Sequence, residues 1–228
     1  MAKVKIVTHP GKYHADDVFA VATLELMLGQ EATVIRTRDS DVIDEGDYVV
    51  DVGGWYDPAR QRFDHHQAEG AGAREDGIPY ASFGLVWKEY GETLAGSHDA
   101  WQYIDSRLVE PIDAPDNGVD LYAVTDAAVE PYLVQDMLEV FRPLWNEDRD
   151  ADSAFRAMVD LAKRILAREI EVAGELVEAA CVVRTIYKNA DDKQIIVFEK
   201  DHPFGREVIG DVLAAYPEPV YAVLYRPE

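Results

Sequence analysis

The sequence predicts an α/β protein: a mostly parallel sheet flanked by helices, then a helical connector and a small C-terminal α/β unit. Three observations predict this class. Short β-branched runs alternate with a helical segment in the first half of the chain, helical periodicity dominates the middle, and strand character returns near the end. A chain of 228 residues can bury one large core, or one core and a small satellite domain.

Strands and helices alternate at the start of the chain. VKIVTH at residues 3–8 is a short β-branched run, and VFAVATLELML after Asp16 has the length and periodicity of a helix that packs on a sheet. Further strands are expected at 33–36, at 48–52 and near 61–64. This order indicates βαβ units around a parallel sheet, and ligands usually bind at the loops that leave such strands.

Helical spacing dominates after EGAGAREDG, an acidic Gly- and Ala-rich stretch that we interpret as a mobile loop. We expect Trp87, Trp101 and Trp145 in this region to pack in the core. The expected helices lie within 81–94, 99–112, 133–145 and 152–180.

The tail predicts a small α/β unit, with strands at 194–199 and 219–225 around a helix at about 206–215. We therefore expect three parts. They are a catalytic, metal-binding domain (1–125), a helical connector (126–190) and a small C-terminal α/β domain (191–228).

The charge of the chain limits its partners. Forty-four acidic residues against twenty-two basic ones give a formal net charge of −22. This charge repels polyanions and argues against a stable complex with DNA. It does not exclude an enzyme that acts on phosphates, because bound divalent cations can dominate the local field.

Cysteine usage and hydropathy indicate a cytoplasmic protein. Cys181 is the only cysteine, so the chain cannot form an internal disulfide, and we interpret this residue as a small buried apolar side chain. The chain shows no signal peptide and no segment near the roughly 20 apolar residues that a membrane span needs, so no membrane partner is expected. The sequence leaves self-association into a homo-oligomer open.

Ligand-type side chains follow the expected strands. His9, His14 and Asp16 share the loop after the first strand, where imidazole and carboxylate together suit manganese, iron or zinc. Asp17, beside them, is interpreted as a helix cap. Asp51 ends an apolar strand, where a carboxylate must be paired, capped or bound to a cation. It is the natural candidate to bridge two metals.

A third cluster, Asp64-His65-His66, follows the strand-like stretch RQRF. Adjacent histidines point in different directions, so one can bind metal while the other reaches toward a substrate. A last acidic loop, IDAPDNGVD, carries Asp113 and Asp116, and alone it would be interpreted as an Asp-Asn-Gly turn.

Taken together, these motifs resemble the DHH phosphoesterase superfamily, which includes RecJ-type exonucleases, oligoribonucleases and manganese-dependent inorganic pyrophosphatases. The closer resemblance is to the melanocyte-proliferating-gene protein family. Its signatures stand here, in the same order, as THPGKYHADD, IRTRD, DVGGWYDPARQRFDHHQ and DAPDNGVD. Weaker similarity continues to the final strand, and members of that family continue past the segment that matches YRPE.

The resemblance implies a DHH-type domain with two metal ions, Mn²⁺ ahead of Mg²⁺, that share a bridging aspartate. It implies that His66 contacts the scissile phosphate and that Asp64 orients a neighbouring histidine. One metal would be held by His9, His14 and Asp51, and the other by Asp16, Asp51, His65 and an aspartate of the DNG loop, Asp116 ahead of Asp113.

The predicted activity is hydrolysis of phosphodiester bonds, with 3′-to-5′ exonuclease action on RNA or short oligonucleotides implied by the resemblance. Candidate phosphate contacts are Lys12, Arg36 and Arg38 near the site and Arg206 in the small domain. Two alternatives stay open. One is a phosphatase for a nucleotide phosphate such as pAp or for pyrophosphate, and the other is a metal-binding protein with little catalytic activity.

Overall fold

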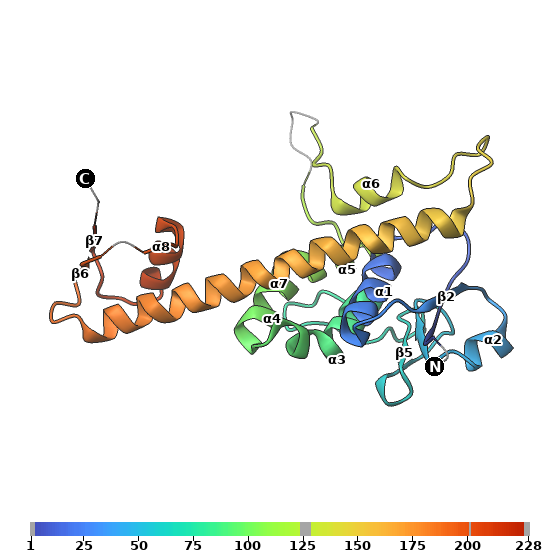
Figure 1. Ribbon diagram of the computed structural model, residues 1–228, viewed down its shortest axis with the longest axis horizontal. Coiled ribbons are helices and arrows are strands. Elements are labelled where there is room, and N and C mark those ends of the chain that lie inside the picture. Colours follow the sequence, from blue (N-terminus) through green and yellow to red (C-terminus); the bar gives the residue numbers. More distant parts are fainter. Residues whose placement is uncertain (1–2, 124–128, 201, 226–228) are drawn as a thin grey trace. The chain divides into compact units, whose positions relative to one another are not determined.

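The computed structural model describes residues 3–123, 129–200 and 202–225 (Figure 1). The chain divides into two units, Met1–Ile170 and Glu171–Glu228. The long helix α7 (Ala151–Asn189) contributes to both. The part of the chain that the structure describes contains no helix long and apolar enough to cross a membrane.

The first unit contains a five-stranded sheet in the order β2-β1-β3-β5-β4. Four strands are parallel, which confirms the predicted α/β class, and β4 is an antiparallel edge strand that the sequence pattern did not predict. The strands are β1 (Lys5–Thr8), β2 (Thr33–Arg36), β3 (Tyr48–Val50), β4 (Tyr56–Asp57) and β5 (Arg62–Phe63).

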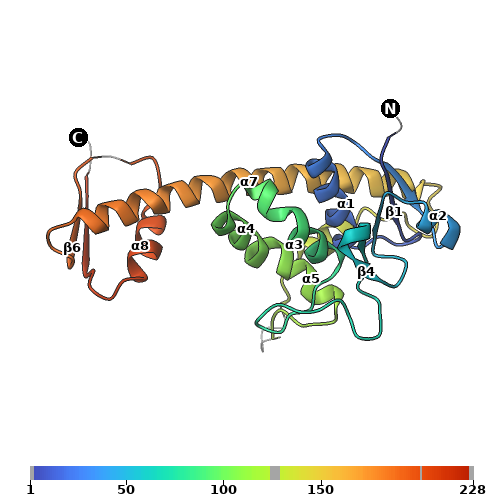
Figure 2. The same ribbon diagram turned by 90° about the horizontal axis from the view of Figure 1, so that it is seen from below.

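Helices cover this sheet on both faces, because side chains alternate along each strand. On one face Val7 and Val49 pack with Ile43 of the short helix α2 (Ser40–Asp44). On the other, α1 (Ala15–Leu28) lies beside α3 (Ser82–Ala95), with the Phe19 and Phe83 ring centroids 5.1 Å apart (Figure 1 and Figure 2).

The remaining helices of the unit differ in extent from those expected from the sequence. The expected helix at 133–145 reduces to α6 (Val134–Glu139), and Trp145 beyond it is 96% exposed, so its predicted core position is wrong. Trp87 is buried as predicted. A 3₁₀ turn η1 (Pro58–Arg60) follows β4, and the segment expected at 99–112 forms α4 (His98–Ile104), a π-helical stretch η2 (Asp105–Val109) and α5 (Glu110–Asp116).

A buried carboxylate joins α1 to α7. Glu25 is 1% exposed, and its carboxylate accepts from Arg156 at 2.6 and 2.7 Å and from Lys163 at 2.9 Å. Its other contact is the backbone N–H of Ala32, which ends the turn after α1. Although burial raises the pKa of Glu25, these partners outweigh it and lower the pKa below the ordinary value.

Replacing Glu25 with glutamine should therefore destabilise the first unit by about 1–3 kcal/mol at pH 7, measured by urea unfolding. Because the folded pKa is lowered, the contribution of Glu25 is present above its unfolded value and disappears as pH falls through the folded value. The difference between the two proteins should shrink at acidic pH. Glu31→Gln, which removes an exposed pair with Lys3, is the matched control and should have little effect.

The second unit is a small α/β arrangement that matches the predicted C-terminal strands and helix. Strands β6 (Ile195–Phe198) and β7 (Tyr221–Leu224) are parallel, and α8 (Arg206–Ala214) connects them. Its core packs side chains of α7 and α8 against β6; the buried members are Val183, Tyr187, Ile196, Phe198, Ile209 and Leu213.

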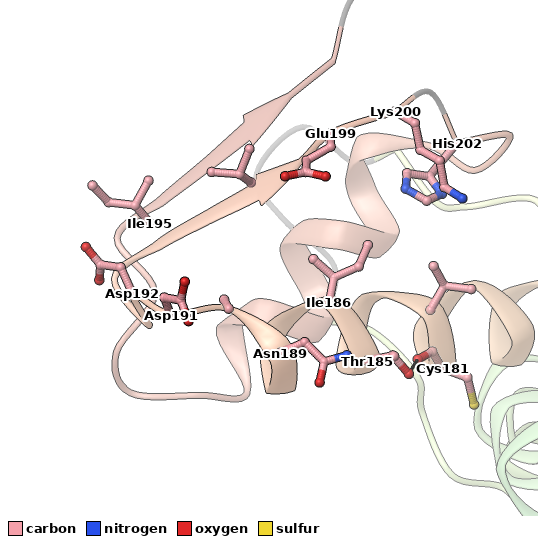
Figure 3. Close-up of a pocket in the computed structure, with 13 residues that line it drawn as sticks. Cys181, Thr185, Ile186, Asn189, Asp191, Asp192, Ile195, Glu199, Lys200 and His202 are labelled. Carbon is pink, nitrogen blue, oxygen red and sulfur yellow. Dashed lines mark hydrogen bonds between the residues drawn. The ribbon is translucent and has the colours of Figure 1, made fainter.

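A groove of about 1150 Å³ lies between α7 and β6 in this unit (Figure 3). Cys181 lines it and is exposed, so the sequence-based interpretation of this residue as buried is wrong. The candidate metal ligands predicted from the sequence, such as His9, Asp51 and His65, do not line this groove.

Candidate metal centre

Three adjacent strands bring the candidate ligands together. The sheet order places β1, β3 and β5 side by side and parallel, so their carboxyl ends meet at one edge. His9 follows β1, Asp51 follows β3, and the triplet Asp64-His65-His66 follows β5. Residues that are more than 50 positions apart in the chain therefore face one another.

The loop after β1 supplies two histidines and two buried carboxylates. His14 is the N-cap of α1, and its backbone N–H donates to Asp17 at 2.9 Å, so Asp17 caps the helix as expected from the sequence. The other oxygen of Asp17 lies 3.1 Å from His9 Nε2. Asp16 is fully buried in the first helical turn, where the positive end of the helix dipole favours a carboxylate.

Asp51 occupies the centre of the cluster. Its Oδ2 lies 3.2 Å from His9 Nε2, and its Oδ1 lies 3.3 Å from His65 Nε2. The backbone of Asp51 is left-handed, with φ of 54°, a conformation that is uncommon outside glycine but is adopted by aspartate and asparagine. This turn at the end of β3 lets one carboxylate face imidazoles on two different loops.

The last turn of α5 brings a third carboxylate to His65. Asp116 Oδ2 lies 3.1 Å from His65 Nε2, and Asp16 Oδ2 lies 3.9 Å from the same nitrogen. Asn117, next in the chain, places its Oδ1 3.2 Å from His65 Nδ1. The amide of Asn117 is itself fixed by carbonyl oxygens of Pro79 and Asp113.

Asp64 and His66 form a pair at the mouth of the site, and His66 Nδ1 also lies 3.3 Å from Asp51 Oδ1. Asp64 Oδ1 lies 2.8 Å from His66 Nδ1 and also accepts the backbone N–H of His66, while Asp64 Oδ2 accepts the N–H of Gly54. The His66 side chain is 61% exposed, and the hydrogen bond that its ring makes to the Asp64 carboxylate raises the pKa of His66. Because Asp64 engages Nδ1, the other ring nitrogen is the one available to a ligand.

The donor set has the chemistry of a divalent cation site. Both oxygens of Asp16 are buried without a hydrogen-bond partner, and the buried Nε2 atoms of His9 and His65 face carboxylate oxygens at 3.1–3.3 Å without hydrogen-bond geometry. Buried polar groups are normally paired, and buried carboxylates require a counter charge. In each of the two histidines Nδ1 is engaged, His9 with the carbonyl of Pro10 and His65 with Asn117, as in metal sites whose second ring nitrogen is held from outside.

The electrostatics point the same way. Burial, reinforced by the charges of Asp51 and Asp116, raises the pKa of Asp16 well above its ordinary value. Burial opposes protonation of His9, but Asp17 and Asp51 outweigh it and raise its pKa to about 10. Burial also disfavours ionised Asp51, but His65 and His9 reverse this and lower its pKa. In the protein alone, protons on histidine compensate part of a negative charge that a cation would neutralise.

Among the described residues, three groups of His and Asp side chains could hold a metal ion. Within each group, the donor atoms lie within 4.8 Å of one another. One group shares Asp51 with the second and His14 with the third, so the three form one continuous cluster. Of its members, His9, His14, Asp51 and His66 line a cavity of about 310 Å³. The groups are His9-His14-Asp51, Asp51-His65-His66 and His14-Asp16-Asp116.

Asp113 lies outside this cluster. It is fully buried, its Oδ2 is 2.9 Å from Arg74 Nη1, and its Oδ1 accepts the N–H of Gly84. An ideal Cβ built on Gly84 would lie 1.8 Å from Asp113 Oδ2, so the helix α3 packs directly on this carboxylate. The structure thus places Asp116, and not Asp113, beside the histidines.

Of the four basic candidates, only Arg38 lines the cavity. Arg36 is engaged elsewhere: its guanidinium donates to the carbonyl of Gly11 at 2.7 Å and to Asp152 at 3.0 Å, and it lies over the Phe155 ring. Lys12 is exposed outside the cavity lining, and Arg206 belongs to the second unit.

Two residues that contact the cluster, Asp17 and Asn117, were not predicted as part of the site from the sequence. Asp17 was interpreted only as a cap, although it also contacts His9, and Asn117 was interpreted as part of a turn, although it holds His65. The position of Asn117 directly after Asp116 in the DNG loop was the available signal.

Comparison with known proteins assigns the chain to a family. Residues 5–227 match a family described as "Uncharacterised protein family (UPF0160)". The human protein named MYG1 exonuclease is 31% identical over 195 residues, which cover 75% of this chain and 51% of the human protein. The Chlamydia trachomatis MYG1 protein is 31% identical over 204 residues, covering 86% and 63%. The fission yeast MYG1 protein C694.04c is 29% identical over 226 residues, covering 88% and 68%.

The chain spans about half the length of the mammalian relatives it matches. No solved structure matches it. Because the family match extends over nearly the whole sequence, this chain belongs to the UPF0160 family, the family of the MYG1 proteins.

Proposed function

We propose that this chain is a divalent-metal-dependent phosphodiesterase of the DHH superfamily that shortens RNA or short oligonucleotides from the 3′ end. The observation that carries the proposal is the position of Asp51. Its two carboxylate oxygens face imidazoles from two different loops, at 3.2 and 3.3 Å, which is the arrangement expected of a carboxylate that bridges two cations. The exonuclease names of mammalian relatives support the substrate class.

The ligands divide naturally around Asp51. We assign His9, His14 and Asp51 to one cation, and Asp16, Asp51, His65 and Asp116 to the other. When bound, two such cations supply a water of lowered pKa and polarise the phosphoryl oxygen. Imidazole and carboxylate donors together favour Mn²⁺ over Mg²⁺, which prefers oxygen ligands.

The chain's own residues then hold the substrate. His66, with its ring fixed by Asp64 and its pKa raised, donates a hydrogen bond to a phosphoryl oxygen. Arg38 is exposed on the same cavity and contacts a flanking phosphate. The positive φ values of Gly53 and Gly54 turn the backbone beside the site and allow a phosphate to approach closely.

Substrate length follows from charge and size. The net charge of −22 opposes binding of a long polyanion, and the cavity of about 310 Å³ admits a terminal group and not a folded strand. These two properties favour short oligonucleotides. They also favour the second candidate, a phosphatase acting on a nucleotide phosphate or pyrophosphate.

Purified protein should be incubated with 5′-labelled RNA oligomers, with pAp and with pyrophosphate, in Mn²⁺, in Mg²⁺ and in EDTA. We expect a Mn²⁺-dependent ladder from RNA that shortens from the 3′ end and disappears in EDTA. Phosphate release from pAp or pyrophosphate without an RNA ladder would instead support the phosphatase. Bound Mn²⁺ without turnover of any of the three would contradict both enzymes and leave a metal-binding role.

A further inference from the structure

A second cavity of about 580 Å³ adjoins the metal centre. It shares three lining residues, Arg38, Val52 and Gly53, with the cavity that His9, His14, Asp51 and His66 line. Its volume falls within the range of about 300–1,000 Å³ that is typical of small-ligand sites. A group that extends from the first cavity past Arg38 would enter this second cavity.

The lining of this cavity includes an apolar base and one indole ring. Ile43 and Val52 are each 7% exposed and form the apolar base, and Trp55 is half-buried beside them. The indole lies against Gly53, since an ideal Cβ there would be 3.3 Å from Trp55 Nε1. With φ of 104° and the indole beside it, position 53 disfavours any residue with a side chain, and Gly53 lines both cavities.

The backbone of Trp55 is tied to the loop that carries the metal-site triplet, because the carbonyl of Trp55 accepts the backbone N–H of Asp64 at 3.3 Å. The guanidinium of Arg60 lies 5.8 Å from the centroid of the indole ring.

The second cavity has a basic residue at one end and an acidic residue elsewhere in its lining. Arg38 lies at the junction with the metal centre, and its side chain has no hydrogen bond or ion pair with any other described residue. Asp44 and the Ser40 hydroxyl line only the second cavity. A phosphate is attracted toward Arg38 and repelled by Asp44, whereas the N–H groups on a base edge can donate to Asp44 and Ser40.

We propose that this second cavity is the nucleobase subsite of the enzyme, in which Trp55 stacks on a base of the substrate. Arg38 holds the adjacent phosphate, and Asp44 accepts hydrogen bonds from the base edge. The proposal rests on the proposed function, because it takes a nucleotide as the ligand. It deepens that function by explaining how a strongly acidic protein binds a nucleotide through its base as well as its phosphate.

The test compares two ligands that differ only in the base. AMP and ribose 5-phosphate should be titrated into the protein by calorimetry, with Mn²⁺ present. The unmodified chain should bind AMP more tightly. Trp55→Ala should weaken AMP binding roughly 5- to 150-fold, the loss expected for one stacked base, and should leave ribose 5-phosphate within about twofold.

Three further variants separate stacking from general damage. Trp55→Phe should keep most of the AMP affinity, Asp44→Ala should weaken AMP alone, and Arg38→Ala should weaken both ligands. Trp145→Ala is the matched control, because this indole is 96% exposed and outside the cavity lining. The Asp44 variant also keeps the test decisive should loss of the indole disturb the fold.

Several outcomes would overturn the subsite. These are equal affinity of the unmodified chain for the two ligands, no detectable AMP binding, or equal losses for both ligands in Trp55→Ala. The proposed function fails on a different measurement, the absence of Mn²⁺-dependent cleavage, so the two failures are distinguishable. A chain that cleaves RNA without discriminating AMP from ribose 5-phosphate would retain the function and lose the subsite.

Discussion

Asp51→Asn should reduce metal-dependent hydrolysis by at least about 10³-fold, a loss equivalent to roughly 4 kcal/mol of transition-state stabilisation. The substitution keeps the side-chain volume, and asparagine accepts the left-handed backbone at this position. It removes the negative charge and replaces one of the two oxygens that face His9 and His65 with an amide nitrogen. No cation can then be bridged.

The measurement combines initial rates on a short RNA with Mn²⁺ uptake by equilibrium dialysis, and circular dichroism checks the fold. Asp148→Asn, the same chemical change at an exposed position, should be neutral in both assays. Normal Mn²⁺ stoichiometry and undiminished turnover in Asp51→Asn would refute the bridging role. Loss of turnover with intact Mn²⁺ binding would move Asp51 from metal binding to another step.

The second large effect concerns stability. Arg74→Met should destabilise the first unit by about 3–5 kcal/mol, because it leaves the fully buried carboxylate of Asp113 and the partly buried carboxylate of Asp105 without their counter charge. The Arg74 side chain is 7% exposed, pairs with Asp105 through two contacts of 2.9 Å, and reaches Asp113 at 2.9 Å. Urea unfolding at pH 7 is the measurement.

The pH dependence gives a sharper check on this triad. Burial, partly offset by Arg74, raises the pKa of Asp113 to about 7. Without the guanidinium, protonation of Asp113 is the remaining way to remove its buried charge, so the cost of Arg74→Met should be smaller at pH 5 than at pH 8. Arg107→Met, which removes a surface pair with Glu169, should cost less than about 1 kcal/mol at either pH. Equal costs for the two arginines would show that the triad is not a buried charge cluster.

The convergence of ligands at one edge of the sheet could be predicted from sequence. His9, Asp51 and His65 each follow an apolar run, and parallel strands have their carboxyl ends on the same side. No contact between distant residues had to be known. Strand order was not needed either, because any parallel arrangement brings such loops to the same edge.

Side-chain partners could not be predicted in this way. Asp113 and Asp116 lie three residues apart on one helix, yet the first pairs with Arg74, about 40 positions earlier, and the second faces His65. Arg36 seemed available for phosphate, but its partners include Asp152, 116 positions later. A local sequence pattern does not predict such contacts. The stretch at 69–77 was interpreted as a mobile loop, but Arg74 within it pairs with Asp105 and Asp113 and anchors it.

A very short element also cannot be predicted from the periodicity of its side chains. Strand β4 has only two residues, too few for alternation to be visible, whereas β5, which is equally short, was expected from the strand-like stretch near 61–64. The expected helix at 133–145 ends at Glu139, and Pro143 cannot continue a helix because it lacks an N–H donor.

The left-handed backbone at Asp51 lowers the stability of the folded protein. A non-glycine residue in this region costs on the order of 1 kcal/mol or more, and packing of the surrounding sheet has to offset it. In return the carboxylate is already aimed before any ligand arrives, so little reorganisation accompanies binding. Glycine at this position would remove the backbone strain, but it would also remove the buried carboxylate that faces His9 and His65, so the strain at residue 51 accompanies the side chain that joins the two loops.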